Sequence, residues 1–143
     1  MRAVLDPNVV ISGLLSPAGN AAWVLQACER GEFELIVSAG LLAELERALA
    51  YPKLRRRVPE ADARDLLAWL RQSGSLAADP DAGPTVRSAD PGDDYLIALA
   101  ESERAILVSG DRHLLDLAQE IPVFSPARFR DEVRGRVRFG RSA

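Results

Sequence analysis

The chain has 143 residues, of which 48% are hydrophobic and 27% are charged, values that fit one globular domain and exclude a disordered protein. No apolar stretch approaches the roughly 18 residues of a membrane helix, and the opening MRAVLDPN lacks a signal-peptide core, so we expect a cytoplasmic protein with no membrane association. Cys28 and His113 are the only cysteine and histidine, which excludes an intramolecular disulfide and a metal site with several Cys or His ligands.

The first half of the chain alternates apolar runs with helix signals. We predict strands at 2–5 and 33–37, and helices at 21–30, at about 40–50, from Pro52 and from Pro59. The first strand is expected to end in a loop at Asp-Pro-Asn. Asn20 and Ser38 are expected to cap the two helices that follow them, and Gly31 to end the first of these helices.

The second half continues this alternation. Residues 74–88 are rich in Asp, Pro and Gly, which predicts a loop with a short embedded strand. Asp90 is expected to cap a helix that has Pro91 at its first position and reaches about Glu103. We predict strands at 105–108 and 121–124, and helices at about 112–119 and from Pro126.

Regular alternation of strands and helices is typical of a parallel sheet with helices on both faces. We therefore predict a three-layer α/β domain at 1–134. The remaining residues, 135–143, are expected to form a basic C-terminal tail.

Several acidic residues follow predicted strands. Asp6 and Asp111 lie just past the strands at 2–5 and 105–108, Glu44 lies on the helix after strand 33–37, and Asp93 and Asp94 lie in the first turns of the helix before strand 105–108. If strands 2–5 and 105–108 are neighbours, these acids meet at one crevice. Clustered carboxylates repel one another unless a cation lies among them, and Mg²⁺ prefers such oxygen ligands.

Four segments together resemble the motifs of PIN domains. They are VLDPNVVISGLL with Asp6, LIVSAGLLAELERAL with Glu44, DPGDDYLIALAES with Asp94, and AILVSGDRHLLDL with Asp111. The resemblance covers about residues 2–130, and its nearest branch is the toxin components of bacterial toxin–antitoxin systems similar to the VapC group. Pro7 departs from the family pattern, which usually has Thr or Ser after the first Asp.

The resemblance implies a ribonuclease that depends on Mg²⁺ or Mn²⁺, is restrained by a cognate antitoxin protein, and often forms a homodimer. It also implies a sheet of about five strands in the order 3-2-1-4-5. Asp6, Glu44, Asp94 and Asp111 are the implied catalytic metal ligands, and Asp93 is an auxiliary ligand or a partner of the helix dipole. Asn8 and Ser109 are the implied supporting residues, with Asn8 orienting Asp6 by a hydrogen bond.

The net charge of −3 conceals basic regions that suit a nucleic-acid enzyme. From Arg128 onward, six Arg face two acids, and a second cluster contains Arg55, Arg56 and Arg57. Three interpretations stay open for them: a solvated face, contacts to RNA phosphates, and a docking site for an acidic antitoxin segment.

Two other functions also stay open. One is a PIN-type RNA- or protein-binding module weakened in catalysis by Pro7. The other is a phosphoryl-transfer domain with Asp6 as nucleophile, although the usual Asp-x-Asp pattern is absent because residue 8 is Asn.

Overall fold

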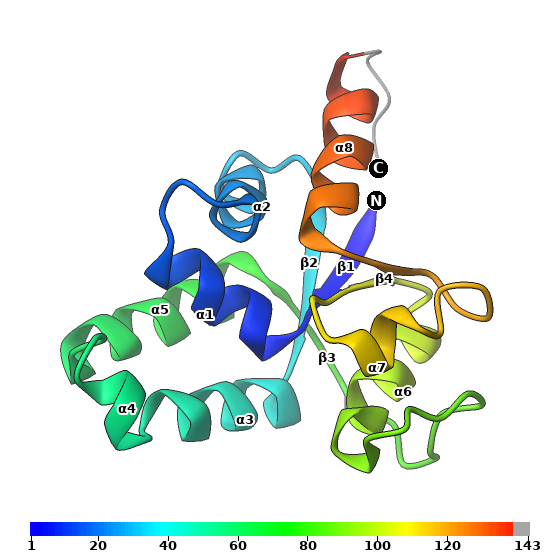
Figure 1. The fold of residues 1–143 in the computed structure, drawn as a ribbon, viewed down its shortest axis with the longest axis horizontal. Coiled ribbons are helices and arrows are strands. Elements are labelled where there is room, and N and C mark those ends of the chain that lie inside the picture. Colours follow the sequence, from blue (N-terminus) through cyan, green and yellow to red (C-terminus); the bar gives the residue numbers. More distant parts are fainter. Residues whose placement is uncertain (139–143) are drawn as a thin grey trace.

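The strands form one parallel sheet in the computed structural model, which describes residues 1–138 (Figure 1). Their order is β3-β2-β1-β4-β5, as predicted. The strands are β1 (Arg2–Leu5), β2 (Glu34–Ser38), β3 (Ser75–Ala77), β4 (Ile106–Val108) and β5 (Val123–Phe124). Four lie within one or two residues of their predicted positions, and β3 lies inside the segment 74–88 where a short strand was expected. The neighbours β1 and β4 are far apart in sequence, and in their register Leu5 lies opposite Val108.

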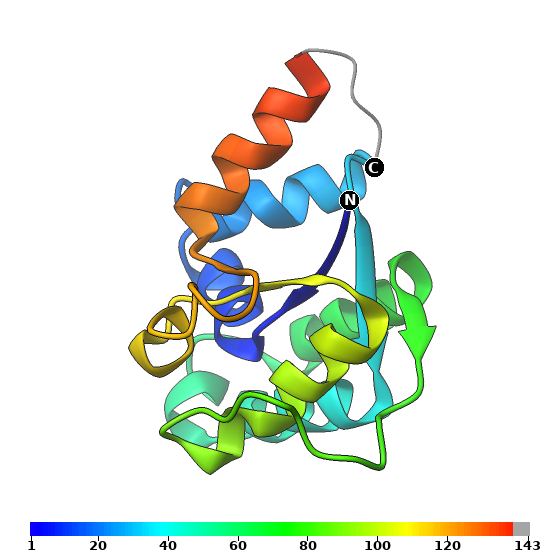
Figure 2. The same ribbon diagram turned by 90° about the vertical axis from the view of Figure 1, so that its right-hand side faces the viewer.

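Helices cover both faces of this sheet (Figures 1 and 2). The helices are α1 (Pro7–Leu15), α2 (Asn20–Glu29), α3 (Ala39–Leu49), α4 (Pro52–Arg55), α5 (Glu60–Ser73), the 3₁₀ turn η1 (Pro91–Asp93), α6 (Asp94–Glu103), α7 (Arg112–Leu115) and α8 (Pro126–Arg138). One core joins the sheet to α1, α2, α3, α5 and α8. The other joins its opposite face to α6 and α7. The predicted three-layer α/β fold is confirmed.

Residues of β1 alternate between the two cores. Ala3 and Leu5 belong to the first core, and Val4 to the second. All three have at most 1% of their surface exposed. This pattern follows from the period of two along a strand, and it explains why a central parallel strand is an uninterrupted apolar run.

Helix α1 is a feature that the sequence prediction missed, since we expected a loop after β1. The helix begins directly at Pro7, because Asp6 accepts a hydrogen bond from the Asn8 N–H at 3.0 Å and Pro suits the first helical position. Its run of Val9, Val10 and Ile11 is buried in the sheet interface. Tertiary burial therefore outweighs the weak helix propensity of β-branched residues.

Three other predictions need correction. Asn20 does not cap α2 with its side chain but is the first residue of that helix. Helix α7 ends at Leu115 rather than near residue 119. Helix α8 continues through Arg138, so residues 135–138 of the expected tail are helical, while 139–143 lie outside the described residues. Helix α8 is held to the core by Phe129, whose ring meets Phe33 edge-on at 5.0 Å, and by the buried Val133 one turn further along the helix.

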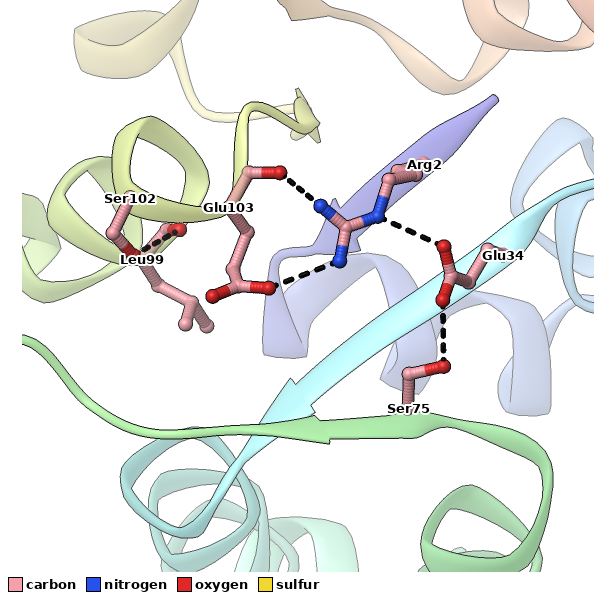
Figure 3. A network of polar contacts seen from close by, with 6 residues as sticks. All are labelled: Arg2, Glu34, Ser75, Leu99, Ser102 and Glu103. Carbon is pink, nitrogen blue, oxygen red and sulfur yellow. Dashed lines mark hydrogen bonds and ion pairs between the residues drawn. The ribbon is translucent and has the colours of Figure 1, made fainter.

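A polar network connects the amino ends of three strands (Figure 3). Arg2 donates from Nε to Glu34 at 2.8 Å and from Nη2 to the Glu103 carboxylate at 2.9 Å, and it also contacts the Glu103 carbonyl. Ser75 donates to the same Glu34 carboxylate at 2.9 Å. The network ties β1, β2, β3 and α6 together at the amino ends of the strands. In an open parallel sheet, ligands bind at the carboxyl ends of the strands, which lie on the opposite side from this network.

Within residues 1–138, no single helix is long and apolar enough to cross a membrane, and only α1 and α2 together, bent by 100°, meet that test of length and composition.

Candidate active site

Asp6 is the central acid of the carboxyl edge. It directly follows β1, its backbone N–H donates to the Val108 carbonyl at 2.9 Å, and only 4% of the residue is exposed. Burial raises the pKa of its carboxyl, hydrogen bonds from the Asn8 N–H and the Ser109 hydroxyl oppose that rise, and the Asp111 charge adds to it. A buried carboxylate with two donors is rigidly placed and gains from a nearby cation.

Asn8 forms a hydrogen bond with Asp6, as expected, and it does so through its backbone and not through its side chain. The Asn8 N–H donates to Oδ1 of Asp6, while the Asn8 side chain is exposed. The difference follows from α1, because the residue two positions after an N-cap offers its amide to the capping carboxylate.

Ser109 connects the acids of β1 and β4. Its buried hydroxyl donates to Oδ2 of Asp6 at 2.8 Å and accepts from the Asp111 N–H at 3.0 Å. Asp111 in turn accepts from the His113 N–H at 2.8 Å and caps α7. The structure thus places the predicted supporting residue between two predicted site acids.

Asp93 faces the same pair of acids from η1. Its pKa is raised to about 6, first by burial and then by the carboxylates of Asp111, Asp90 and Asp6, in that order of importance. Its Oδ2 is buried and has no hydrogen-bond partner among residues 1–138. An unpartnered buried carboxylate oxygen beside other acids is an open position for a cation.

Asp94, the acid that the family motif favours, has a different environment. Its Oδ1 accepts from the Ser88 N–H at 3.0 Å, and its Oδ2 pairs with Arg87 at 3.2 Å. These contacts hold the loop before η1. The structure therefore brings Asp93, rather than Asp94, toward Asp6 and Asp111.

Glu44 lies at the side of this cluster on α3. Its carboxylate forms an ion pair with Arg47, one turn further along the helix, and 45% of the side chain is exposed. The charge of Glu44 still reaches the site, because it contributes to the pKa of Tyr95. Glu44 must leave Arg47 if it is to join the other carboxylates.

Tyr95 is a site residue that the sequence analysis did not identify. Its hydroxyl is buried without a hydrogen-bond partner in the described part of the chain. Burial raises the pKa of this phenol, and four carboxylates add to the rise in the order Asp6, Glu44, Asp93, Asp79. In sequence, Tyr95 resembles any aromatic residue of an apolar helix, and only its position directly after two acids could have singled it out.

The donor set fits a hard divalent cation by its chemistry, since every side-chain ligand on offer is a carboxylate oxygen. The unpartnered Oδ2 of Asp93 and the raised pKa values of Asp6 and Asp93 point the same way. As they stand, no three Asp, Glu, His or Cys side chains of residues 1–138 are grouped closely enough to hold a metal ion. Mutual repulsion keeps such acids apart until a cation offsets it.

Comparison with known proteins identifies the family of this chain. A model of the PIN domain matches residues 2–113, which is most of the chain. The chain belongs to the PIN domain family. PIN domains are generally nucleases and typically use divalent metal ions.

One curated protein is similar to this chain in sequence. The uncharacterized protein MJ1680 of Methanocaldococcus jannaschii is 27% identical over 120 residues, which span 84% of this chain and 77% of that protein.

Three solved structures share the PIN fold. PAE2754 from Pyrobaculum aerophilum has a TM-score of 0.62 at 20% identity, covering 94% of this chain and 90% of its own. VapBC2 from Rickettsia felis, bound to a DNA fragment from its promoter, has a TM-score of 0.59 at 13% identity, covering 87% of this chain and 98% of its own. FitAcB from Neisseria gonorrhoeae has a TM-score of 0.56 at 21% identity, with the same coverage of 87% of this chain and 98% of its own.

Two further sequence features of this PIN domain have clear positions. Pro7 is buried at the start of α1, where its missing N–H costs nothing.

Arg55 of α4 pairs with Glu60 at 3.5 Å, and Arg56 and Arg57 are exposed. Helix α4 follows the far end of α3 and is remote from α7 in Figure 1, so contacts of these Arg residues to RNA stay a prediction.

Proposed function

We propose that this PIN domain is a metal-dependent endoribonuclease and the toxin of a toxin–antitoxin pair. The observation that carries the proposal is the link from Asp6 through Ser109 to Asp111 at the carboxyl ends of two neighbouring strands, beside Asp93, whose buried Oδ2 has no partner among residues 1–138. Asp6, Asp93 and Asp111 would hold Mg²⁺ or Mn²⁺, with Glu44 as a fourth ligand after it leaves Arg47. Asp94 remains the alternative to Asp93 as the acid from α6.

A divalent cation, when bound, makes a water molecule a stronger nucleophile and offsets the charge of the attacked phosphate. The protein residues supply position. Ser109 orients Oδ2 of Asp6 and the backbone of Asp111, and the Asn8 N–H orients Oδ1 of Asp6. Burial keeps these groups in place between catalytic cycles, so little reorganisation precedes the chemical step.

The proposed partners follow from the same family. The motifs resemble the toxin branch of PIN domains, and the fold is similar to VapBC2, which supports a cognate antitoxin protein as partner. RNA is the proposed substrate, a homodimer the proposed assembly, and the cytoplasm the proposed location.

Cleavage of a mixed single-stranded RNA tests the proposal, with Mn²⁺, with Mg²⁺ and with EDTA. We expect cleavage that needs metal and falls at least about 100-fold in Asp6→Asn, because that variant removes the best-placed ligand. Asp116→Asn, at an exposed acid that follows α7, is the matched control and should cleave normally.

Equal cleavage by the parent and by Asp6→Asn would reject the assigned site and point to a contaminating nuclease. RNA binding without cleavage under any metal would instead favour the binding module that lacks catalysis.

A further inference from the structure

A pocket opens directly beside Asp111. It has a volume of about 320 Å³ and is lined by Asn8, Ser12, Ala21, Gly110, Asp111 and Pro126, among others. We call it the Asp111 pocket. Its walls come from α1, from the start of α2, from the turn after β4 and from the start of α8. A volume at the lower end of the roughly 300–1,000 Å³ of ligand sites suits one nucleotide.

Two polar side chains face this pocket without protein partners. The Asn8 amide and the Ser12 hydroxyl are one helical turn apart on α1, and within residues 1–138 neither forms a hydrogen bond with another side chain or with the backbone. Both residues are exposed. Asn8 uses only its backbone N–H, for Asp6, so its amide is free to read the edge of a base.

The other walls are apolar and open. Ala21 and Pro126 offer flat or small apolar surfaces, against which a base ring can stack. A Cβ added to Gly110 would meet no atom within 4 Å, so this wall leaves room for a ligand. Polar groups at one side and apolar groups at the other match the edges and faces of a nucleobase.

A positioned guanidinium belongs to α8, the helix whose start forms one wall of the pocket. Arg130 is one turn after Pro126 on α8, donates to Oδ1 of Asn20 at 3.2 Å, and lies over the Trp23 ring at 5.1 Å from its centroid. Among residues 1–138 it forms no ion pair with an acid. A rigid cation without an acidic partner is suited to a phosphate.

We propose that the Asp111 pocket binds the nucleotide next to the bond that is cut, in a single-stranded RNA, and that Arg130 contacts the following phosphate. The proposal rests on the proposed function for the position of the cut bond. RNA is favoured over an acidic protein segment because Asp111 belongs both to the pocket and to the carboxylate cluster, so the occupant of the pocket touches the reacting centre. The Asp111 pocket would then select the nucleotide at one position of the target.

Binding of a fluorescent RNA pentanucleotide, measured in EDTA with Asp6→Asn protein as the parent, tests the pocket without cleavage. Ser12→Phe fills the pocket and should weaken binding at least about fivefold, which corresponds to one stacked base. Gly110→Leu fills it from another wall and should do the same. Arg130→Gln should lower the slope of log binding constant against log salt by about 0.7, the value for one phosphate contact of a single strand.

Matched controls lie on α5, at its exposed end. Ser73→Phe adds the same ring and Arg71→Gln removes the same charge, and both should bind RNA as the parent does. A thermal melt of each variant identifies any that fails to fold. Equal binding by all folded variants would overturn the pocket proposal. A polyglutamate peptide that displaces RNA, and that binds Ser12→Phe and the parent equally, would also overturn it, because the RNA would then be bound outside the pocket.

Cleavage assays separate this proposal from the nuclease itself. In the metal-dependent enzyme, Ser12→Phe and Gly110→Leu should change which nucleotide adjoins the cut, whereas Arg71→Gln should not. If the parent cuts RNA and every variant cuts it at the same sites with the same efficiency, the nuclease stands and the pocket is wrong. If nothing cuts but the pocket variants still lose binding, the pocket stands as an RNA-binding site, and both the nuclease and the placement of the pocket beside a cut bond are wrong.

Discussion

The Ser109 hydroxyl donates a hydrogen bond of 2.8 Å to Oδ2 of Asp6, a residue 103 positions earlier in the chain. Both residues are at the carboxyl ends of neighbouring strands and both are buried, at 0% and 4% exposure. The bond lowers the pKa of a carboxyl that burial raises. It thereby favours the charged form that a metal ligand needs.

Ser109→Ala should therefore impair both stability and catalysis. The variant leaves the Asp111 N–H without its acceptor and removes one donor from Asp6, which should cost about 1–3 kcal/mol of unfolding free energy. Denaturant unfolding measures this loss. The pH at which cleavage reaches half of its maximum should rise, because the Asp6 pKa rises further. Ser102→Ala, which loses a hydroxyl bonded to the Leu99 carbonyl, is the control and should leave that pH unchanged.

Asp93→Asn should stabilise the metal-free protein above pH 6. The pKa of Asp93 is about 6 in the folded protein against an ordinary 3.8, so the folded state keeps a proton between these values that the unfolded chain loses. Stability therefore falls as the pH rises through this window. After allowance for solvent screening, we expect the variant to gain about 1 kcal/mol at pH 7 and nothing below pH 4.

Asp94→Asn is the matched comparison for Asp93→Asn. It weakens the pairing with Arg87, so it should lower stability slightly and show no gain that appears between pH 4 and 6. Urea unfolding of both variants at pH 3.5, 5 and 7 in EDTA measures the difference. A pH-dependent gain in stability in Asp94→Asn, and none in Asp93→Asn, would mean that Asp94, the acid that the motif favours, belongs to the site in place of Asp93.

Tyr95→Phe should leave the metal-free fold as stable as the parent or more stable. The hydroxyl has no partner among the described residues, and removing such a group recovers its desolvation cost, about 1 kcal/mol. Thermal melts at pH 7 in EDTA measure this. A large loss of stability would mean that the hydroxyl has a protein partner in solution. Tyr51→Phe, at an exposed tyrosine, is the control.

Divalent metal should raise the melting temperature of the parent. A ligand at 100 times its dissociation constant stabilises by about 2.7 kcal/mol. The same addition should have little effect on Asp6→Asn or Asp111→Asn, and differential scanning fluorimetry with Mn²⁺, Mg²⁺ and EDTA compares them. An equal shift in the parent and in both variants would place the bound metal elsewhere.

The order of the sheet came from the resemblance to PIN domains and is confirmed. Most of the strands followed from the sequence because central parallel strands are short apolar runs bounded by turn signals. Helix α1 did not, since Val9–Ile11 has the composition of a strand and becomes helical only through Asp6, Pro7 and the burial that the sheet provides. The end of α8 was missed for a similar reason. Val133 contributes to the core from a segment that is otherwise almost wholly polar.

For the site, the motifs named Asp94 as a ligand and Asp93 only as an auxiliary residue, whereas in the structure Asp93 is the acid that lies toward Asp6 and Asp111. Adjacent residues at a helix start point in different directions, and the directions depend on η1 and on the loop that Arg87 and Ser88 occupy. No pattern in the sequence encodes that loop. Tyr95 and the free Asn8 amide likewise became visible only when side chains from distant segments were placed together.

Asp6 follows the most central strand and shares a backbone hydrogen bond with Val108, whereas Asp93 follows a long, largely exposed segment between β3 and α6. The acids of the site therefore belong to parts of the molecule that should open on different timescales. We expect the Asp6 amide to exchange its hydrogen only through global unfolding and the Asp93 amide through local opening. A cation bound to both Asp6 and Asp93 would slow amide hydrogen exchange in residues 78–93 and leave exchange in the core unchanged. Metal binding would therefore be seen in a hydrogen-exchange experiment as increased protection of this one segment.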